Sequence, residues 1–176
     1  MAIEHAVLGL LAIQPRHGYD LAREFTPDTV MGDIVHLESG MLYAHLKKLE
    51  RRGWVSAELK PQEARPARKV FSLTGEGREE LHRWLTEPVD KTRDIRLEFL
   101  LKLYLALQTE PELVDGLVSE QRAVCDQFVA SLEEQIASEE DGFRLLVLEM
   151  RLAQNRALVR WLERASEIEN VAVPAS

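Results

Sequence analysis

The sequence contains a single cysteine, Cys125, among its 176 residues. One thiol excludes a disulfide within the chain and cannot build a thiolate metal cluster, so we expect a reducing, cytoplasmic environment. Long hydrophobic runs are also missing. The best candidate, residues 99–107, is interrupted by Lys102 and falls far short of the roughly 20 apolar residues that a membrane-spanning helix needs. The first residues, MAIEHAVLGLLAIQ, lack the basic region and cleavage pattern of a signal peptide, so the sequence predicts no membrane partner.

Motifs for cofactor chemistry and catalysis are absent as well. The sequence has no GxxxxGK[ST], GxSxG or HExxH pattern, and no GxGxxG follows an expected strand. The five histidines are scattered without the spacing of metal ligands. His17 is more typical of a structural hydrogen bond than of catalysis, and Cys125 is more typical of inert packing than of a redox sensor. We therefore expect no enzyme, no metal and no cofactor.

The net charge of −8 is distributed unevenly along the chain. Residues 1–88 hold 12 Lys and Arg against 13 Asp and Glu, whereas residues 89–176 hold 10 against 17. Within residues 41–71 the balance reverses to eight Lys and Arg against three Glu. Because charges act on a phosphate only within a Debye length of about 10 Å, an acidic second half is compatible with a basic surface that binds DNA.

Residues 39–52, SGMLYAHLKKLERR, have the pattern of a short amphipathic helix. Leu42, Leu46 and Leu49 share one side at helical spacing, and cationic residues occupy the opposite side. Ser39 is placed to cap the helix and Gly53 to end it. A charged outer face is usually a solvated face, so this helix alone does not establish a DNA-binding function.

A β-hairpin is expected directly after this helix. Residues 54–59 and 68–73 alternate apolar and polar side chains, and the tip between them, KPQEARPA, holds two prolines that should interrupt regular pairing. The tip and the second strand are rich in Lys and Arg. A helix followed by a basic hairpin is the arrangement of a winged helix, in which the helix fills the major groove and the wing reaches phosphates or the minor groove.

Helices are expected over most of the remaining chain. Their ranges are residues 2–13, 17–25, 74–86, 95–107, 112–136 and 143–165, and residues 34–37 could supply a third strand. Residues 87–90, EPVD, are expected to form a hinge between the DNA-binding part and the rest of the chain. The predicted fold is therefore mostly α, with a winged helix-turn-helix DNA-binding domain (an α/β wing) at residues 1–88 and a helical dimerisation domain at residues 89–176.

Three blocks of the first half resemble the PadR-like transcriptional regulators in their order and spacing. They are LGLLAIQPRHGYDLA, GMLYAHLKKLERRGWV and PARKVFSLTGEGREELHRWL. The resemblance implies a cytoplasmic homodimer, commonly a repressor, that binds a pseudo-palindromic operator in double-stranded DNA. It also implies that Tyr43 matches the tyrosine of the recognition helix and that Arg68 and Lys69 match the basic pair of the wing. In the second half, only the arrangement of helices is similar to the long members of the family.

Residues for DNA and effector binding follow from this interpretation. The predicted DNA-binding residues are Ser39, Tyr43, Lys47, Lys48, Arg51, Arg65, Arg68 and Lys69. Tyr43 could instead pack beside the leucine stripe. Trp84 and Trp161 are candidates for binding a small aromatic effector, with core packing as the alternative. A different class of function also stays open, in which the winged helix is a protein-interaction module that does not bind DNA.

Overall fold

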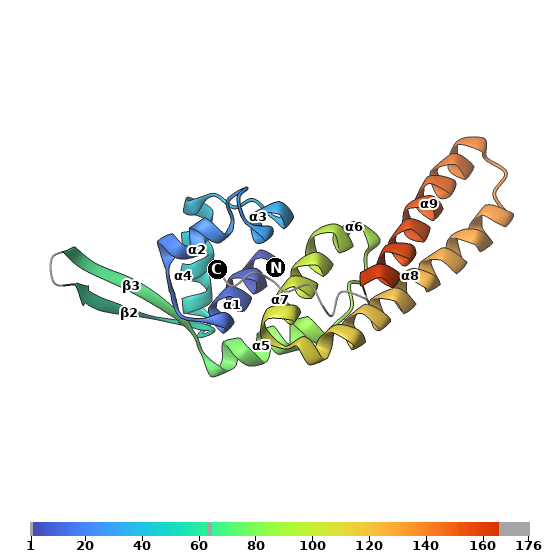
Figure 1. Ribbon diagram of the computed structural model, residues 1–176. Coiled ribbons are helices and arrows are strands. Elements are labelled where there is room, and N and C mark those ends of the chain that lie inside the picture. Colours follow the sequence, from blue (N-terminus) through green and yellow to red (C-terminus); the bar gives the residue numbers. More distant parts are fainter. Residues whose placement is uncertain (1, 63–64, 166–176) are drawn as a thin grey trace.

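The computed structural model describes residues 2–62 and 65–165, without the side chains of residues 61–67. The molecule is elongated, with a β-hairpin projecting at one end and a pair of long helices at the other (Figure 1). The first half comprises α1 (Ala2–Ile13), β1 (Arg16–His17), α2 (Gly18–Glu24), α3 (Val30–Ile34), α4 (Ser39–Arg51), β2 (Val55–Gln62), β3 (Arg65–Leu73) and α5 (Gly75–Thr86). The second half comprises α6 (Thr92–Asp94), the π-helix η1 (Ile95–Phe99), α7 (Leu100–Thr109), the 3₁₀-helix η2 (Pro111–Leu113), α8 (Val114–Ala137) and α9 (Gly142–Ala165).

Helix α1 is the centre of the core. Every residue from Glu4 to Leu11 is buried, and the helix packs against α4, α5, α7 and β3. The predicted stripe of α4 faces this core, since Leu42, Leu46 and Leu49 are at most 1% exposed. Burying each leucine contributes about 1.5–3 kcal/mol, so this stripe fixes which side of α4 remains in solvent.

The sheet has three antiparallel strands in the order β1-β3-β2. The expectation of a third strand at residues 34–37 is wrong, because the two-residue strand β1 pairs with Val70 and Phe71 and occupies that edge of β3. Residues 30–34 form α3 instead. The Thr29 hydroxyl caps this helix by accepting the Gly32 amide at 2.9 Å, and a side chain at Gly32 would collide with the Thr26 carbonyl oxygen.

The wing hairpin has longer strands than expected. The ladder continues to the pair Gln62 and Arg65, with one irregularity between Lys60 and Gln62 where Pro61 lies. A proline lacks the amide hydrogen that a ladder requires, but this loss disturbs the ladder at a single position. Pro61 and Pro66 therefore lie within β2 and β3 and do not end these strands.

The helix ends confirm two predictions from turn chemistry and correct a third. Gly53 follows α4 with a positive φ of 76°, a conformation that favours glycine. The Thr74 hydroxyl caps α5 by accepting the Gly77 amide at 3.0 Å. Ser39, however, is the first residue of α4, and Glu38 takes the cap position without a side-chain hydrogen bond. The Ser39 hydroxyl is therefore left at the surface.

The second half is helical, as expected, and the predicted ranges lie close to α7, α8 and α9. Helices α8 and α9 form the antiparallel pair at one end of the molecule (Figure 1). Helix α7 packs on α1 so closely that a Cβ at Gly9 would lie 2.5 Å from Leu105 Cδ1. One core cluster thus spans the hinge, and the domain division at residue 88 stays a prediction. Within the described ranges, no helix is long and apolar enough to cross a membrane.

Two buried polar side chains hold the hinge. The Gln121 side chain on α8, which is fully buried, accepts the Val89 amide at 2.7 Å and donates to the Val89 carbonyl at 3.0 Å. Lys102 on α7 is 1% exposed and donates to the Glu87 carbonyl at 2.5 Å. Burial lowers the pKa of Lys102 below its ordinary value. Side chains of the second half therefore satisfy the backbone where α5 ends.

Candidate nucleic-acid interface

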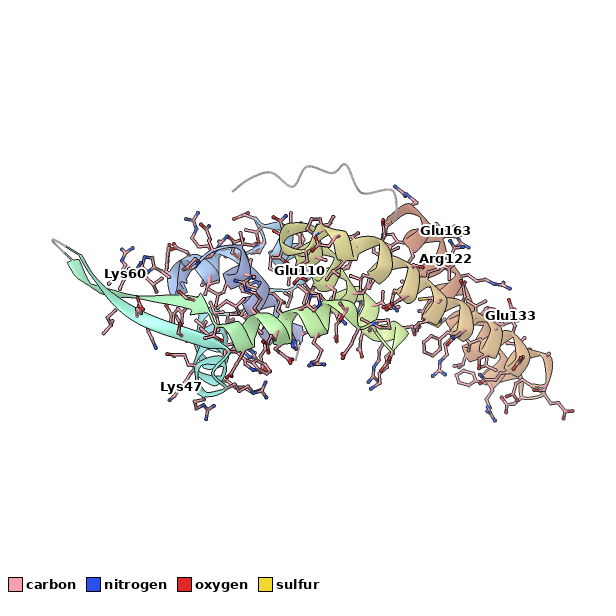
Figure 2. The ribbon with its side chains drawn as sticks, turned by 90° about the horizontal axis from the view of Figure 1, so that it is seen from below. Lys47, Lys60, Glu110, Arg122, Glu133 and Glu163 are labelled. Atoms are coloured by element: carbon pink, nitrogen blue, oxygen red, sulfur yellow. The ribbon has the colours of Figure 1, made fainter. Side chains whose placement is uncertain are left out.

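The outer face of α4 is a stripe of four predicted residues. Ser39, Tyr43, Lys47 and Arg51 are spaced four residues apart, and all four are exposed. A spacing of four residues sets them in one row along the helix, beside the buried leucine stripe. A helix that turns 42, 46 and 49 into the core leaves this row in solvent. Figure 2 shows Lys47 and Lys60 at the same end of the molecule, on α4 and on the hairpin respectively.

Tyr43 lies between α4 and the start of α2. Its side chain is 50% exposed, and its ring lies so near Gly18 that a Cβ there would be 2.7 Å from the hydroxyl oxygen. Gly18 thus provides the space that the ring occupies. The tyrosine therefore packs on one edge and presents the other to solvent, so both interpretations of this residue remain open.

Lys48 has an internal partner. Its Nζ donates to Glu4 Oε1 at 2.5 Å, and Arg52 Nη1 donates to Glu4 Oε2 at 3.0 Å. Glu4 is only 3% exposed. Burial acts to raise the pKa of Glu4, but the hydrogen bond from Lys48 and the nearby charges, including His45, bring it below its ordinary value. Glu4 thus stays ionised at neutral pH and fastens α4 to α1, which favours a structural role for Lys48.

The wing presents cations on both of its strands. Lys60 and Arg68 face each other in the β2–β3 register, and both are exposed. Lys69 donates to Glu50 on α4 at 2.9 Å and lies 5.1 Å from the centre of the Phe71 ring. Arg65 belongs to β3, and its side chain is outside the described residues. Arg68 and Lys69 are thus both exposed, and Lys69 also connects the wing to α4.

Sequence analysis did not single out Lys60 as a binding residue. Its position opposite Arg68 depends on the strand register, which the proline-rich tip concealed. Among the described residues, no acidic partner lies within salt-bridge distance of Lys47, Arg51, Lys60 or Arg68. At the other end, by contrast, Arg122 pairs with Glu163 at 2.8 Å and Arg156 with Glu133 at 2.6 Å (Figure 2). Four cations without an acidic partner thus lie on α4 and the wing.

The two candidate effector residues have different aromatic neighbours. Trp84 is 4% exposed, stacks on His5 with ring centroids 4.7 Å apart, and donates from Nε1 to Glu98 Oε1 at 2.9 Å. Trp161 packs edge-on against Phe99 at 6.0 Å. Both tryptophans therefore have the surroundings of core residues, and this geometry favours packing for each of them.

The part of the chain that the structure describes contains no group of three or more potential metal ligands. The site is instead an exposed helix stripe beside a projecting basic hairpin, both held by a buried leucine core. Such an arrangement defines the winged-helix class of DNA-binding proteins. Its chemistry is that of phosphate and base-edge contacts.

Comparisons with known proteins identify the family. Residues 7–83 match the family described as "Transcriptional regulator PadR-like family", and residues 95–168 match "Virulence activator alpha C-term". The chain belongs to the PadR-like transcriptional regulators, in the long form with a helical second half. This is a family of transcriptional regulators and not of enzymes.

Two curated relatives and one solved structure show the extent of the similarity. The negative transcriptional regulator PadR of Bacillus subtilis is 29% identical over 174 residues, covering 92% of this chain and 93% of that protein. A probable transcriptional regulator of Mycobacterium tuberculosis is 39% identical over 93 residues, covering 53% of this chain and 48% of that protein. The crystal structure of Bacillus subtilis PadR in complex with operator DNA has 25% identity and a TM-score of 0.49, covering 96% of this chain and 99% of that one.

Proposed function

We propose that this chain is a homodimeric repressor that binds a pseudo-palindromic operator through α4 and the wing. The observation that carries the proposal is the exposed stripe of α4 beside the wing. Among the described residues, four cations there have no acidic partner at salt-bridge distance, namely Lys47, Arg51, Lys60 and Arg68. The printed name of the Bacillus subtilis relative, a negative transcriptional regulator, supports repression. A repressor of this kind acts where the DNA is, so we also propose a cytoplasmic location.

The predicted residues have different roles within this proposal. Lys47, Arg51 and Arg68 contact phosphates or base edges, and Lys60 joins them on the wing. Ser39 and Tyr43 supply hydroxyl groups that can donate to a phosphate and fix the register on the duplex. Of the other predicted residues, Lys48 and Lys69 hold α4 against α1 and the wing, and Arg65 stays a predicted contact.

The test is selection of bound DNA from a random pool, followed by a salt titration on the enriched sequence. We expect a pseudo-palindrome with half-sites about one helical turn, roughly 34 Å, apart. The logarithm of the affinity should fall linearly with the logarithm of salt concentration, since phosphate contacts release counterions. A folded dimer that enriches no sequence at low salt would contradict the proposal and favour the protein-interaction module.

We further propose that a small molecule relieves DNA binding. One solved structure of the Bacillus subtilis protein is in complex with p-coumaric acid, which is a small aromatic acid. For this chain, Trp84 and Trp161 remain candidates for effector binding. A fluorescence titration with planar aromatic acids tests them, and tryptophan emission that does not change would contradict their involvement.

A further inference from the structure

A groove of about 980 Å³ lies between the segment after the hinge and the α8–α9 pair. One wall comes from residues 90–96 and the other from residues 128–135 of α8 and 151–158 of α9. Its floor includes Phe128, Leu132 and Leu158. Neither Trp84 nor Trp161 lines it. The groove is thus separate from α4 and the wing and from both tryptophans.

The lining of the groove is positively charged although this half of the chain is strongly acidic. It contains Lys91, Arg93, Arg96 and Arg151 against a single acidic side chain, Asp90. Arg93 lies 3.6 Å from its neighbour Asp94. For Arg96 and Arg151, no acidic partner within the described residues lies at salt-bridge distance. Cations thus stand on both walls, above an apolar floor.

A buried polar atom in the lining lacks a hydrogen-bond partner. Asn155 on α9 is 4% exposed, and its Nδ2 donates to the Arg151 carbonyl at 2.9 Å. Its Oδ1 accepts no hydrogen bond from any described residue. This oxygen is enclosed by the protein, so Asn155 lines the groove without offering this acceptor to it.

We propose that this groove binds a small organic anion with at least two negative charges and an apolar body. Guanidinium groups on opposite walls match anionic groups at the two ends of such a ligand, and Phe128 and Leu132 match its body. A ligand with one charge engages only one wall, and a neutral ligand engages neither.

A ligand in this groove can change the affinity for DNA, a consequence that rests on the proposed function. The groove wall begins at Asp90, directly after Val89, whose backbone Gln121 holds on both sides. An anion bridging Arg96 and Arg151 connects the segment after the hinge to α9. It therefore favours one orientation of the α8–α9 pair relative to the winged helix, and the spacing of two half-sites depends on that orientation.

Isothermal titration calorimetry of the full chain without DNA tests the binding. The probes are terephthalate and phenyl phosphate as dianions, benzoate as the monoanion of the same ring, and benzamide as the neutral control. We expect terephthalate, with a carboxylate at each end, to bind about tenfold more tightly than benzoate or phenyl phosphate, whose charge lies at one end, since a further charged hydrogen bond contributes this much. Benzamide should not bind. Failure of terephthalate to bind at millimolar concentration would overturn the proposal.

Variants locate the site. Arg96→Gln and Arg151→Gln should each weaken terephthalate binding about tenfold, whereas Arg160→Gln, an exposed change on α9 outside the groove, should not. Asn155→Asp, with folding checked by circular dichroism, should abolish binding because it adds a like charge to the groove. If the two groove variants change the dimer dissociation constant but not terephthalate binding, a second copy fills the groove and the proposal is wrong.

DNA binding is measured separately on the selected operator, with and without terephthalate. We expect operator affinity to change at least about threefold when the groove is saturated, in the wild type and not in Arg96→Gln. Anion binding without any operator would contradict the proposed function and leave this inference standing. Operator binding without anion binding would support the proposed function and contradict the anion-binding groove.

Discussion

The buried carboxylate of Glu4 connects the core to the proposed recognition helix. It lies in the first turn of α1 and receives hydrogen bonds from two cations of α4, one turn apart. Its neighbour His5 stacks on Trp84 and lies 2.8 Å from Glu80 on α5. Two consecutive residues of α1 therefore fix the positions of α4, which precedes the wing in the chain, and of α5, which follows it.

Glu4→Gln should destabilise the fold by about 2 kcal/mol, because it removes the buried negative charge to which Lys48 and Arg52 donate hydrogen bonds. The two cations are partly exposed and regain water, which keeps the loss below that of a fully buried pair. Urea denaturation at pH 7 measures the change. Glu79→Gln, an exposed change on α5, is the matched control and should alter stability by less than about 0.5 kcal/mol.

The pH dependence of stability gives a second measurement on the same residue. The pKa of folded Glu4 lies below its ordinary value of 4.5, so its contribution is complete above pH 4.5 and is lost as the pH falls through the lowered pKa. Wild-type stability should therefore decline below pH 4.5 more steeply than that of Glu4→Gln. Parallel curves for the two proteins would show that Glu4 is not the titrating group.

At the scale of elements, the hinge and the wing each depend on a contact between distant segments. Gln121 on α8 satisfies both backbone groups of Val89, 32 residues away. Lys69 on β3 pairs with Glu50 on α4 and connects the wing to the helix beside it. The first contact is buried and concerns stability, whereas the second is exposed and concerns the charge that DNA would meet.

Gln121→Met keeps the size of the side chain and removes both hydrogen bonds to Val89. We expect a loss of about 2–4 kcal/mol, because a buried amide and a buried carbonyl are left without partners. Thermal and urea denaturation measure it. Gln127→Met at an exposed position of the same helix is the control. Equal stability of the two variants would mean that water replaces the glutamine at the hinge.

Glu50→Gln should strengthen DNA binding, since it removes the carboxylate that neutralises Lys69. The salt dependence should steepen by up to about one unit, the contribution of one further phosphate contact. Arg68→Ala should do the opposite and weaken all DNA sequences alike. Fluorescence anisotropy at several salt concentrations measures both, with Glu112→Gln as the distant control. A changed sequence preference with an unchanged salt slope would show that Arg68 reads bases.

At the scale of the whole molecule, an apolar stripe on α9 faces away from the rest of the chain. Phe143, Leu146 and Met150 are 76%, 60% and 62% exposed, and their spacing places them on one side of the helix. An exposed patch of this kind is typical of an interface. It lies at the opposite end from the wing (Figure 1), so pairing through α9 would leave both winged helices open to DNA.

Leu146→Asp should weaken the dimer about tenfold or more without reducing the stability of the monomer fold, since the side chain is already exposed. Sedimentation velocity over a range of concentrations measures dissociation, and operator affinity should fall in parallel at low protein concentration. Gln127→Asp on α8 introduces the same charge as a control. An unchanged dimer with Leu146→Asp would exclude this face as the interface.

The sequence by itself determined the parts of the protein that depend on periodicity and turn chemistry. The leucine stripe of α4 required a buried side at a spacing of three and four residues, and Gly53 and Thr74 marked helix ends through their own backbone and hydroxyl chemistry. Strand alternation indicated the wing, and the uneven charge indicated where an anion would bind. These signals are local, so they are readable without knowing which segments meet.

Only the tertiary structure decided which charges have partners. Lys48 and Glu4 are 44 residues apart, and Lys69 and Glu50 are 19 residues apart, so no spacing along the chain reveals either pair. The third strand was missed because two residues are too few for a periodic signal and its edge exists only once β3 is in place. The cationic groove was missed for the same reason, because its walls come from segments more than 30 residues apart that fold against each other.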